Sequence, residues 1–101
     1  MIFANKIFYG IATIPNTINS SFLQTLTDEL SNTKSRTITV NASSGQYIWY
    51  AVPASLGTCT FKVGGFSGGF VLANTITHNG DSYYVYRSSN SGLGTQIVEV
   101  I

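Results

Sequence analysis

The amino-acid sequence predicts a mainly β protein, an antiparallel β-sandwich of about seven strands with one short helix near residues 20–31. Hydrophobic residues make up 44% of the 101 residues and aromatic residues 13%, which is too apolar for a disordered chain. Only 9% are charged, well below the roughly 25% of an ordinary globular domain. Ser, Thr, Asn and Gly supply 42 residues, of which Thr favours strands and the others favour turns. A chain of this length predicts one domain, residues 1–101.

The first third of the chain combines a strand pattern with a helix pattern. Residues 6–12 form the expected first strand. Residues 19–21, Asn-Ser-Ser, offer N-cap chemistry for a helix. Large apolar side chains then recur at helical spacing, at Phe22, Leu23, Leu26 and Leu30. Acidic residues at 28–29 lie near the C-terminal end of this segment, where the helix dipole disfavours negative charge, so the predicted helix is short. Residues 31–35 are predicted to form a polar loop.

Strands and turns are predicted for the middle of the chain. Residues 37–40 alternate apolar and polar side chains, which is typical of a strand with one buried face. Residues 47–52 are bulky on both faces and predict a central strand covered on each side, which a proline ends. In residues 58–63 the apolar positions, Cys59 among them, alternate again. The glycine-rich residues 64–70 predict a bend, and they lack the Lys-Ser/Thr pair of a phosphate-binding loop.

The Asn79–Gly80 pair is the sharpest local signal, because both residues tolerate the positive φ angles of a type I′ turn. It predicts a hairpin between residues 75–78 and 81–87, in which His78 lies opposite Asp81 and the later pairs follow in step. One face of the hairpin then carries Ile76, Tyr83 and Val85. The other face carries Thr75, Thr77, Tyr84 and Tyr86.

The burial of the second hairpin face decides whether its tyrosines can contact another molecule. If the face with Tyr83 turns to the core, Tyr84 and Tyr86 stand on the outside. The alternative is that they lie beneath the helix or the second sheet as ordinary core residues. A glycine-containing turn at residues 88–94 and a final strand at 95–101 complete the predicted sandwich.

Residues suited to catalysis or metal binding are few. His78, Asp81 and Ser82 surround the hairpin turn, but a catalytic triad needs a sheltered cleft, so His78 is predicted to be an ordinary turn residue. One His and one Cys are too few for structural zinc, and calcium at Asp81 and Asn79 has only weak support. Cys59 cannot form an internal disulfide and is predicted to be a small buried apolar residue. We expect no enzymatic activity, no cofactor and no metal.

Charge and hydropathy exclude other classes of partner. The net charge is +1 and the five basic residues are scattered, which predicts no nucleic-acid surface. The longest apolar run, residues 47–54, is too short to span a bilayer, and the N-terminus does not have the pattern of a secretory signal. We therefore expect no membrane contact and synthesis in a cytoplasm. A mean hydropathy of +0.19 suggests that neighbouring subunits cover some apolar surface.

Four segments together resemble a known family. They are Phe8-Tyr9-Gly10, the run YIWYAVP at residues 47–53, the Gly-Gly-Phe bend, and YYVYRS at residues 83–88. This layout resembles small β-sandwich domains of tailed-bacteriophage virion proteins, found in tail-fibre and collar proteins. The resemblance implies a non-enzymatic structural or assembly module of the virion, made in the bacterial host cytoplasm. Its implied partners are other virion proteins and further copies of itself, with a homotrimer favoured.

Two functions remain open at this point. In the first, exposed aromatic side chains pack against partner chains in the particle. In the second, the same tyrosines stack on the sugars of a host cell-surface glycan, so that the domain is an adhesin. Assembly is favoured, because glycan sites usually place carboxylates beside the aromatic rings and acidic residues are nearly absent here. The candidate contact residues for either function are Tyr84, Tyr86, Arg87, Trp49 and Tyr50.

Overall fold

A computed structural model describes residues 5–101. Within these residues it contains nine strands, one α-helix and one 3-10 turn. Their bounds are β1 Asn5–Ala12, α1 Ser20–Leu23, β2 Thr27–Ser31, β3 Arg36–Ala42, β4 Tyr47–Pro53, η1 Ala54–Leu56, β5 Phe61–Val63, β6 Phe66–Ser67, β7 Phe70–His78, β8 Asp81–Ser88 and β9 Gly94–Val100. Sheet A has the strand order β2-β1-β4-β8-β7, and sheet B has the order β3-β9-β5-β6. Because all pairs are antiparallel, the predicted sandwich is confirmed, with nine strands in place of about seven.

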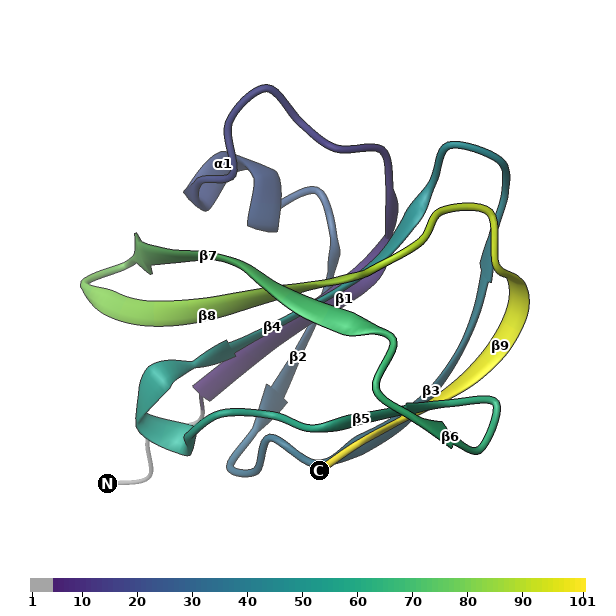
Figure 1. The fold of residues 1–101 in the computed structure, drawn as a ribbon. Helices are drawn as coiled ribbons and strands as arrows, with labels where there is room; N and C mark the ends of the chain where they lie inside the picture. The colour runs from purple at the N-terminus through teal and green to yellow at the C-terminus, as the bar shows by residue number, and fades with distance from the viewer. Residues whose placement is uncertain (1–4) are drawn as a thin grey trace.

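The two sheets form two layers (Figure 1). A first core lies between them. Sheet B contributes the side chains that point inward from its strands, and sheet A contributes larger side chains from β1, β4 and β8. The buried members are Ile7, Ile38, Ala42, Ile48, Tyr50, Val52, Phe61, Tyr86, Val98 and Val100. The alternation read at residues 37–40 thus places Ile38 in the core and its polar neighbours in solvent, as predicted.

A second core covers the opposite face of sheet A. The segment between β1 and β2, which contains α1, crosses this face and packs Phe22 and Leu23 onto it. The buried residues of sheet A in this core are Phe8, Trp49, Ala51, Tyr83 and Val85. Strand β4 is therefore covered on both sides, which confirms the interpretation of residues 47–52 as a central strand.

The β7–β8 hairpin has the predicted turn and register. His78 lies opposite Asp81, Ile76 opposite Tyr83 and Thr75 opposite Tyr84. Asn79 has φ 50 and Gly80 has φ 84, the positive values that a type I′ turn requires. The sequence pattern did not reveal that β7 extends back to Phe70 and carries a bulge between Leu72 and Asn74.

The helix is much shorter than predicted, and residues 27–31 form a strand instead. Asn19 caps α1 as expected, since its side chain accepts a hydrogen bond of 3.1 Å from the amide of Phe22. After Gln24 the chain turns and β2 pairs with β1 over five residues, with Leu30 opposite Lys6. The acidic side chains that disfavour the end of a helix are tolerated on this edge strand, where Asp28 forms an ion pair of 2.9 Å with Lys6.

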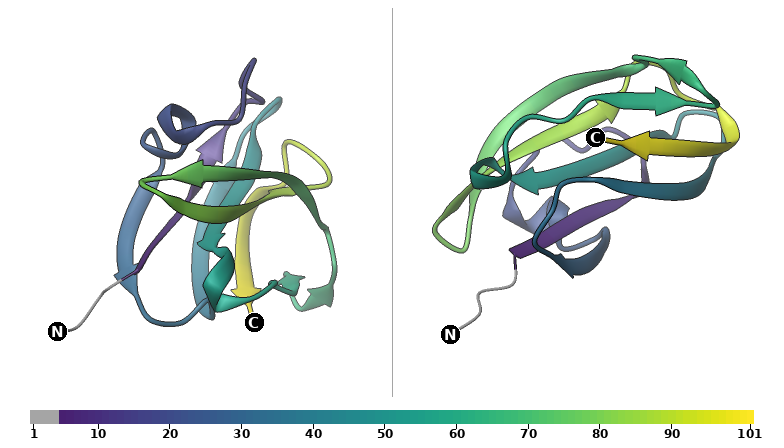
Figure 2. Two further views of the ribbon diagram at one scale, coloured as in Figure 1. Left: turned by 90° about the vertical axis from the view of Figure 1, so that its left-hand side faces the viewer. Right: turned by 90° about the horizontal axis from the view of Figure 1, so that it is seen from below.

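Residues 58–70 also differ in detail from their predicted strand and bend. Strand β5 begins at Phe61, so Cys59 precedes it, although the backbone of Thr60 exchanges hydrogen bonds with Ile101. Residues 66–67 form the extra short strand β6 at the outer edge of sheet B. Seen from below, β9 lies between β5 and β3 (Figure 2). Among residues 5–101, no helix is long and apolar enough to cross a membrane.

Candidate functional site

Three of the five candidate contact residues lie in the core of the molecule. Trp49 and Tyr50 are 0% exposed on opposite faces of β4, and Tyr86 is 6% exposed between the sheets. Tyr84 is partly buried, with its ring 6.5 Å from that of Tyr86. The expectation of an exposed tyrosine face is wrong for Tyr86, because sheet A is covered on both sides: sheet B lies over one face and the α1 segment over the other.

The buried tyrosines use their hydroxyl groups to connect strands to loops. Tyr50 donates to the carbonyl of Lys34 over 2.8 Å, and Tyr83 donates to the carbonyl of Lys6 over 2.9 Å. The Tyr86 hydroxyl accepts a hydrogen bond of 2.9 Å from the amide of Cys59. Burial raises the pKa of Tyr50, Tyr83 and Tyr86 above the ordinary value. These side chains therefore hold the fold together and present no flat ring to a ligand.

Arg87, the fifth candidate, is engaged in local contacts. Its guanidinium carbon lies 4.7 Å from the centre of the Tyr47 ring, a cation–π arrangement. Its Nη1 also donates to the carbonyl of Ser88 over 3.0 Å. The side chain is partly buried, so only part of it is open to a partner.

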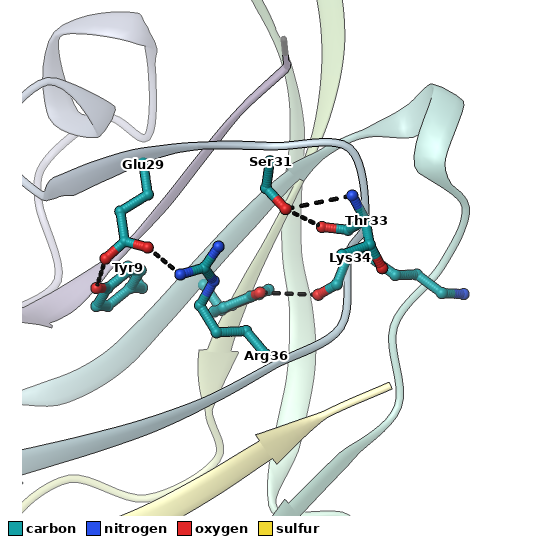
Figure 3. Close-up of polar contacts among 7 residues, drawn as sticks. Tyr9, Glu29, Ser31, Thr33, Lys34 and Arg36 are labelled. Atoms are coloured by element: carbon teal, nitrogen blue, oxygen red, sulfur yellow. Dashed lines mark hydrogen bonds and ion pairs between the residues drawn. The ribbon is translucent and has the colours of Figure 1, made fainter.

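A polar cluster that the sequence did not reveal joins the two sheets at the β1–β2 edge (Figure 3). The carboxylate of Glu29 accepts hydrogen bonds from the Tyr9 hydroxyl at one oxygen and from Arg36 Nη1 at the other. Strands β1 and β2 of sheet A are thereby tied to β3 of sheet B. The hydrogen bond to Glu29 raises the pKa of Tyr9, with burial adding to the effect. Within residues 5–101, the buried Nε of Arg36 has no hydrogen-bond partner. The positive charge of the Arg36 side chain is therefore balanced mainly by the carboxylate of Glu29.

The Glu29→Gln substitution should therefore destabilise the fold. Loss of the negative charge weakens the hydrogen bonds from Arg36 and Tyr9, and we expect the free energy of unfolding to fall by about 1–2 kcal/mol, since the pair is partly solvated. Urea unfolding followed by circular dichroism measures the change. Asp28→Asn is the matched control: its ion pair with Lys6 is about half exposed, and no measurable change is expected. Equal stability of the two variants would contradict a cross-sheet role for Glu29.

His78 is buried, so its prediction as a solvated turn residue is wrong. It is 5% exposed, and its Nδ1 shares a hydrogen bond with the hydroxyl of Ser20 in α1. Its ring meets the rings of Phe8 and Tyr83 edge-on, at 5.2 and 5.6 Å between centres. The hairpin end packs down onto the α1 segment, and this removes His78 from solvent. Within residues 5–101, no three His, Cys, Asp or Glu side chains gather closely enough to hold a metal ion.

Cys59 and its surroundings form a hollow at the β5–β6 end of sheet B. The thiol is partly buried and free, and burial raises its pKa to about 11. It lines a pocket of about 410 Å³, whose apolar walls include Phe61, Phe70 and Ile101. The rings of Phe61 and Phe70 stack at 4.1 Å between centres. Such a volume and lining are typical of sites that accept an apolar group.

The chain then passes from β6 of sheet B to β7 of sheet A (Figure 1). Around this passage it exposes large apolar side chains. Phe66 is 81% exposed, Leu72 51% and Val71 41%. Val71 and Leu72 pair with Arg87 and Tyr86, so their side chains point to opposite faces of β7. We call this segment the Phe66 edge. No charged residue occurs between Lys62 and Asp81. Contiguous exposed apolar surface marks sites of contact with other molecules, whereas single exposed apolar residues are normal.

No family model, curated protein or solved structure matches this chain.

Proposed function

We propose that this protein is a non-enzymatic structural module of a virus particle of the tailed-bacteriophage type, which assembles with further copies of itself and with other virion proteins. The exposed Phe66 edge is the observation that carries this proposal. The resemblance of the YIWYAVP and YYVYRS segments to virion β-sandwich domains supplies the setting. Glycan binding through stacked tyrosines takes second place, because Trp49, Tyr50 and Tyr86 present no ring to solvent.

The physical argument rests on the cost of leaving the Phe66 edge in water. Phe66 is the first residue after the Gly64–Gly65 turn between β5 and β6, and its side chain is 81% exposed. Burying a side chain of this size contributes about 1.5–3 kcal/mol. A contact with another chain recovers this free energy, and repeated contacts in a particle stabilise each subunit by mass action.

The proposal predicts that Phe66→Ser weakens self-association. The mass of the purified protein in solution, measured by light scattering over a range of concentrations, should exceed that of the monomer for the unmodified chain. The loss of one apolar contact per copy should raise the dissociation constant about ten-fold to hundred-fold. Leu30→Ser, at a 65% exposed position on β2, is the matched control and should leave the mass unchanged. A monomer at every concentration, equal for all three chains, would contradict assembly through this edge.

A further inference from the structure

We propose that the partner at the Phe66 edge is a second copy of this chain, and that each copy inserts Phe66 into the other's pocket beside Cys59. This inference rests on the proposed assembly function and names the contact that carries it. A protruding phenyl group and an open apolar pocket of about 410 Å³ occur on the same chain. The pocket volume exceeds that of one phenyl side chain, so the insertion needs no displacement of the core.

The position of the two features favours a two-fold arrangement. Ser67 and Gly68, which directly follow Phe66 in sequence, line the pocket of the same chain. Phe66 pairs with Val63 and Ser67 with Lys62, so the two side chains point to opposite faces of sheet B. The proposed two-fold axis therefore lies beside the open edge of β6, where each Phe66 can reach the opposite pocket. Both contacts then form at once, which is the self-complementary geometry of a closed dimer. The outer edge of β6 also faces this axis, because β6 is the last strand of sheet B.

The chemistry of the pocket suits a phenyl group. The stacked rings of Phe61 and Phe70, 4.1 Å apart, form an aromatic wall of the pocket, and Ile101 and Cys59 add further apolar walls. Aromatic rings in such clusters attract one another beyond the effect of burial alone. No part of the pocket requires a charged ligand.

The charges around the pocket fit a second copy of the same chain. Lys62 is the charged side chain of the pocket lining, and it stands opposite Glu99 in the β5–β9 register. A cation and an anion side by side leave the surface nearly neutral, so two identical copies approach without strong repulsion. The uncharged stretch between Lys62 and Asp81 extends this neutral surface along β6 and β7.

The expected dimer is weak. Each inserted aromatic side chain buries roughly 150–250 Å². Two such insertions bury far less than the roughly 1,200 Å² of a standard stable complex. The dimer should therefore form at micromolar concentrations or above and dissociate on dilution. A dimer also differs from the trimer that the family resemblance implies, and solution mass separates the two.

The test uses a variant that fills the pocket without touching Phe66. Thr60 is exposed at the pocket rim, and Thr60→Trp places an indole in the space reserved for the partner's phenyl group. Thr58→Trp, at an exposed position outside the pocket lining, is the matched control. We expect the unmodified chain and Thr58→Trp to be dimers in light scattering, and Thr60→Trp and Phe66→Ser to be shifted to monomer by at least ten-fold in dissociation constant. Circular dichroism of each variant confirms that it is folded.

A cross-linking measurement locates the contact directly. A photoreactive p-benzoylphenylalanine at position 66 keeps an aromatic group at the start of β6. On irradiation it should form a covalent dimer, and mass spectrometry should place the cross-link on the partner's peptide from Cys59 to Phe61 or on the one around Phe70. A cross-link elsewhere, or an oligomer that survives Thr60→Trp but not Phe66→Ser, overturns the pocket insertion and leaves the proposed assembly function standing. A monomer at all concentrations overturns both.

Discussion

Replacement of Trp49 by alanine should reduce the free energy of unfolding by about 3–5 kcal/mol. The indole is 0% exposed, and the ring of Phe22 meets it edge-on at 4.6 Å between centres. Its Nε1 donates a hydrogen bond of 3.0 Å to the carbonyl of Ala12, at the end of β1. The substitution leaves a cavity between sheet A and the α1 segment and leaves that carbonyl without its donor. A domain of this size has a total stability of about 5–15 kcal/mol, so the variant should be close to unfolding.

Urea unfolding followed by far-ultraviolet circular dichroism measures this effect, since the variant has no tryptophan left to report by fluorescence. Ile14→Ala is the matched control: Ile14 precedes α1 in the same connecting segment but is 52% exposed, and its loss should change stability by less than about 0.5 kcal/mol. A change of under about 1 kcal/mol for Trp49→Ala would show that the α1 segment does not form an integral second core.

Alkaline pH should unfold the protein with unusual steepness. Four tyrosines have a raised pKa in the folded protein: Tyr50, Tyr83 and Tyr86 because of burial, and Tyr9 because its hydroxyl donates to Glu29. The neutral phenol is favoured in the folded state, so the stabilisation is fully present below the unfolded pKa of about 10. It is lost as the pH rises from there toward the folded-state pKa. Each tyrosine that stays neutral in the fold removes up to about 1.4 kcal/mol per pH unit above that point.

The measurement is the free energy of unfolding at successive pH values from neutral to strongly alkaline, with phenolate absorbance recorded in parallel. We expect a plateau up to about pH 10 and then a fall, with a burst of phenolate absorbance as the protein unfolds. Tyr50→Phe should make the fall less steep, while its lost hydrogen bond to Lys34 lowers the plateau by about 1 kcal/mol. A stability that is level across this range would mean that the tyrosines are solvated in the folded protein.

Local sequence signals predicted the parts of the fold that depend on local geometry. The Asn79–Gly80 turn set the register of β7 and β8, and the bulky residues of β4 indicated a strand covered on both sides. The helix assignment failed at residues 27–31, where Leu26 and Leu30 match a helical period by their spacing alone. Leu30 is 65% exposed, so this spacing does not describe a buried helix face. Pairing with β1, a contact remote in sequence, decides the structure there.

The candidate site was harder to predict, because burial on the second face of a sheet depends on what covers it. The hairpin register placed Tyr86 and Tyr83 on opposite faces correctly, yet both are buried because sheet A has a layer on each side. Phe66 gave the opposite result: an aromatic residue that sequence reasoning left inside a bend is the most exposed large apolar side chain of the described residues. The glycine pairs on each side of the Phe66–Ser67 segment were the available signal, since such pairs mark tight turns around a short edge strand. Gly69 illustrates the constraint, because its φ is +82 and a Cβ there would lie 3.3 Å from Val63.

The place of β9 in sheet B has a consequence for how the chain folds. This strand lies between β3 and β5, which do not pair with each other, and it is the last strand in sequence order. During synthesis, the strands of sheet A and their covering segment leave the ribosome before β9 exists. Until β9 arrives, the inner faces of Tyr50 and Tyr86 are uncovered, and β3 has no partner in its sheet. Closure therefore waits for contacts between distant parts of the chain, which makes folding slow and leaves a half-formed sandwich open to misassociation with its neighbours.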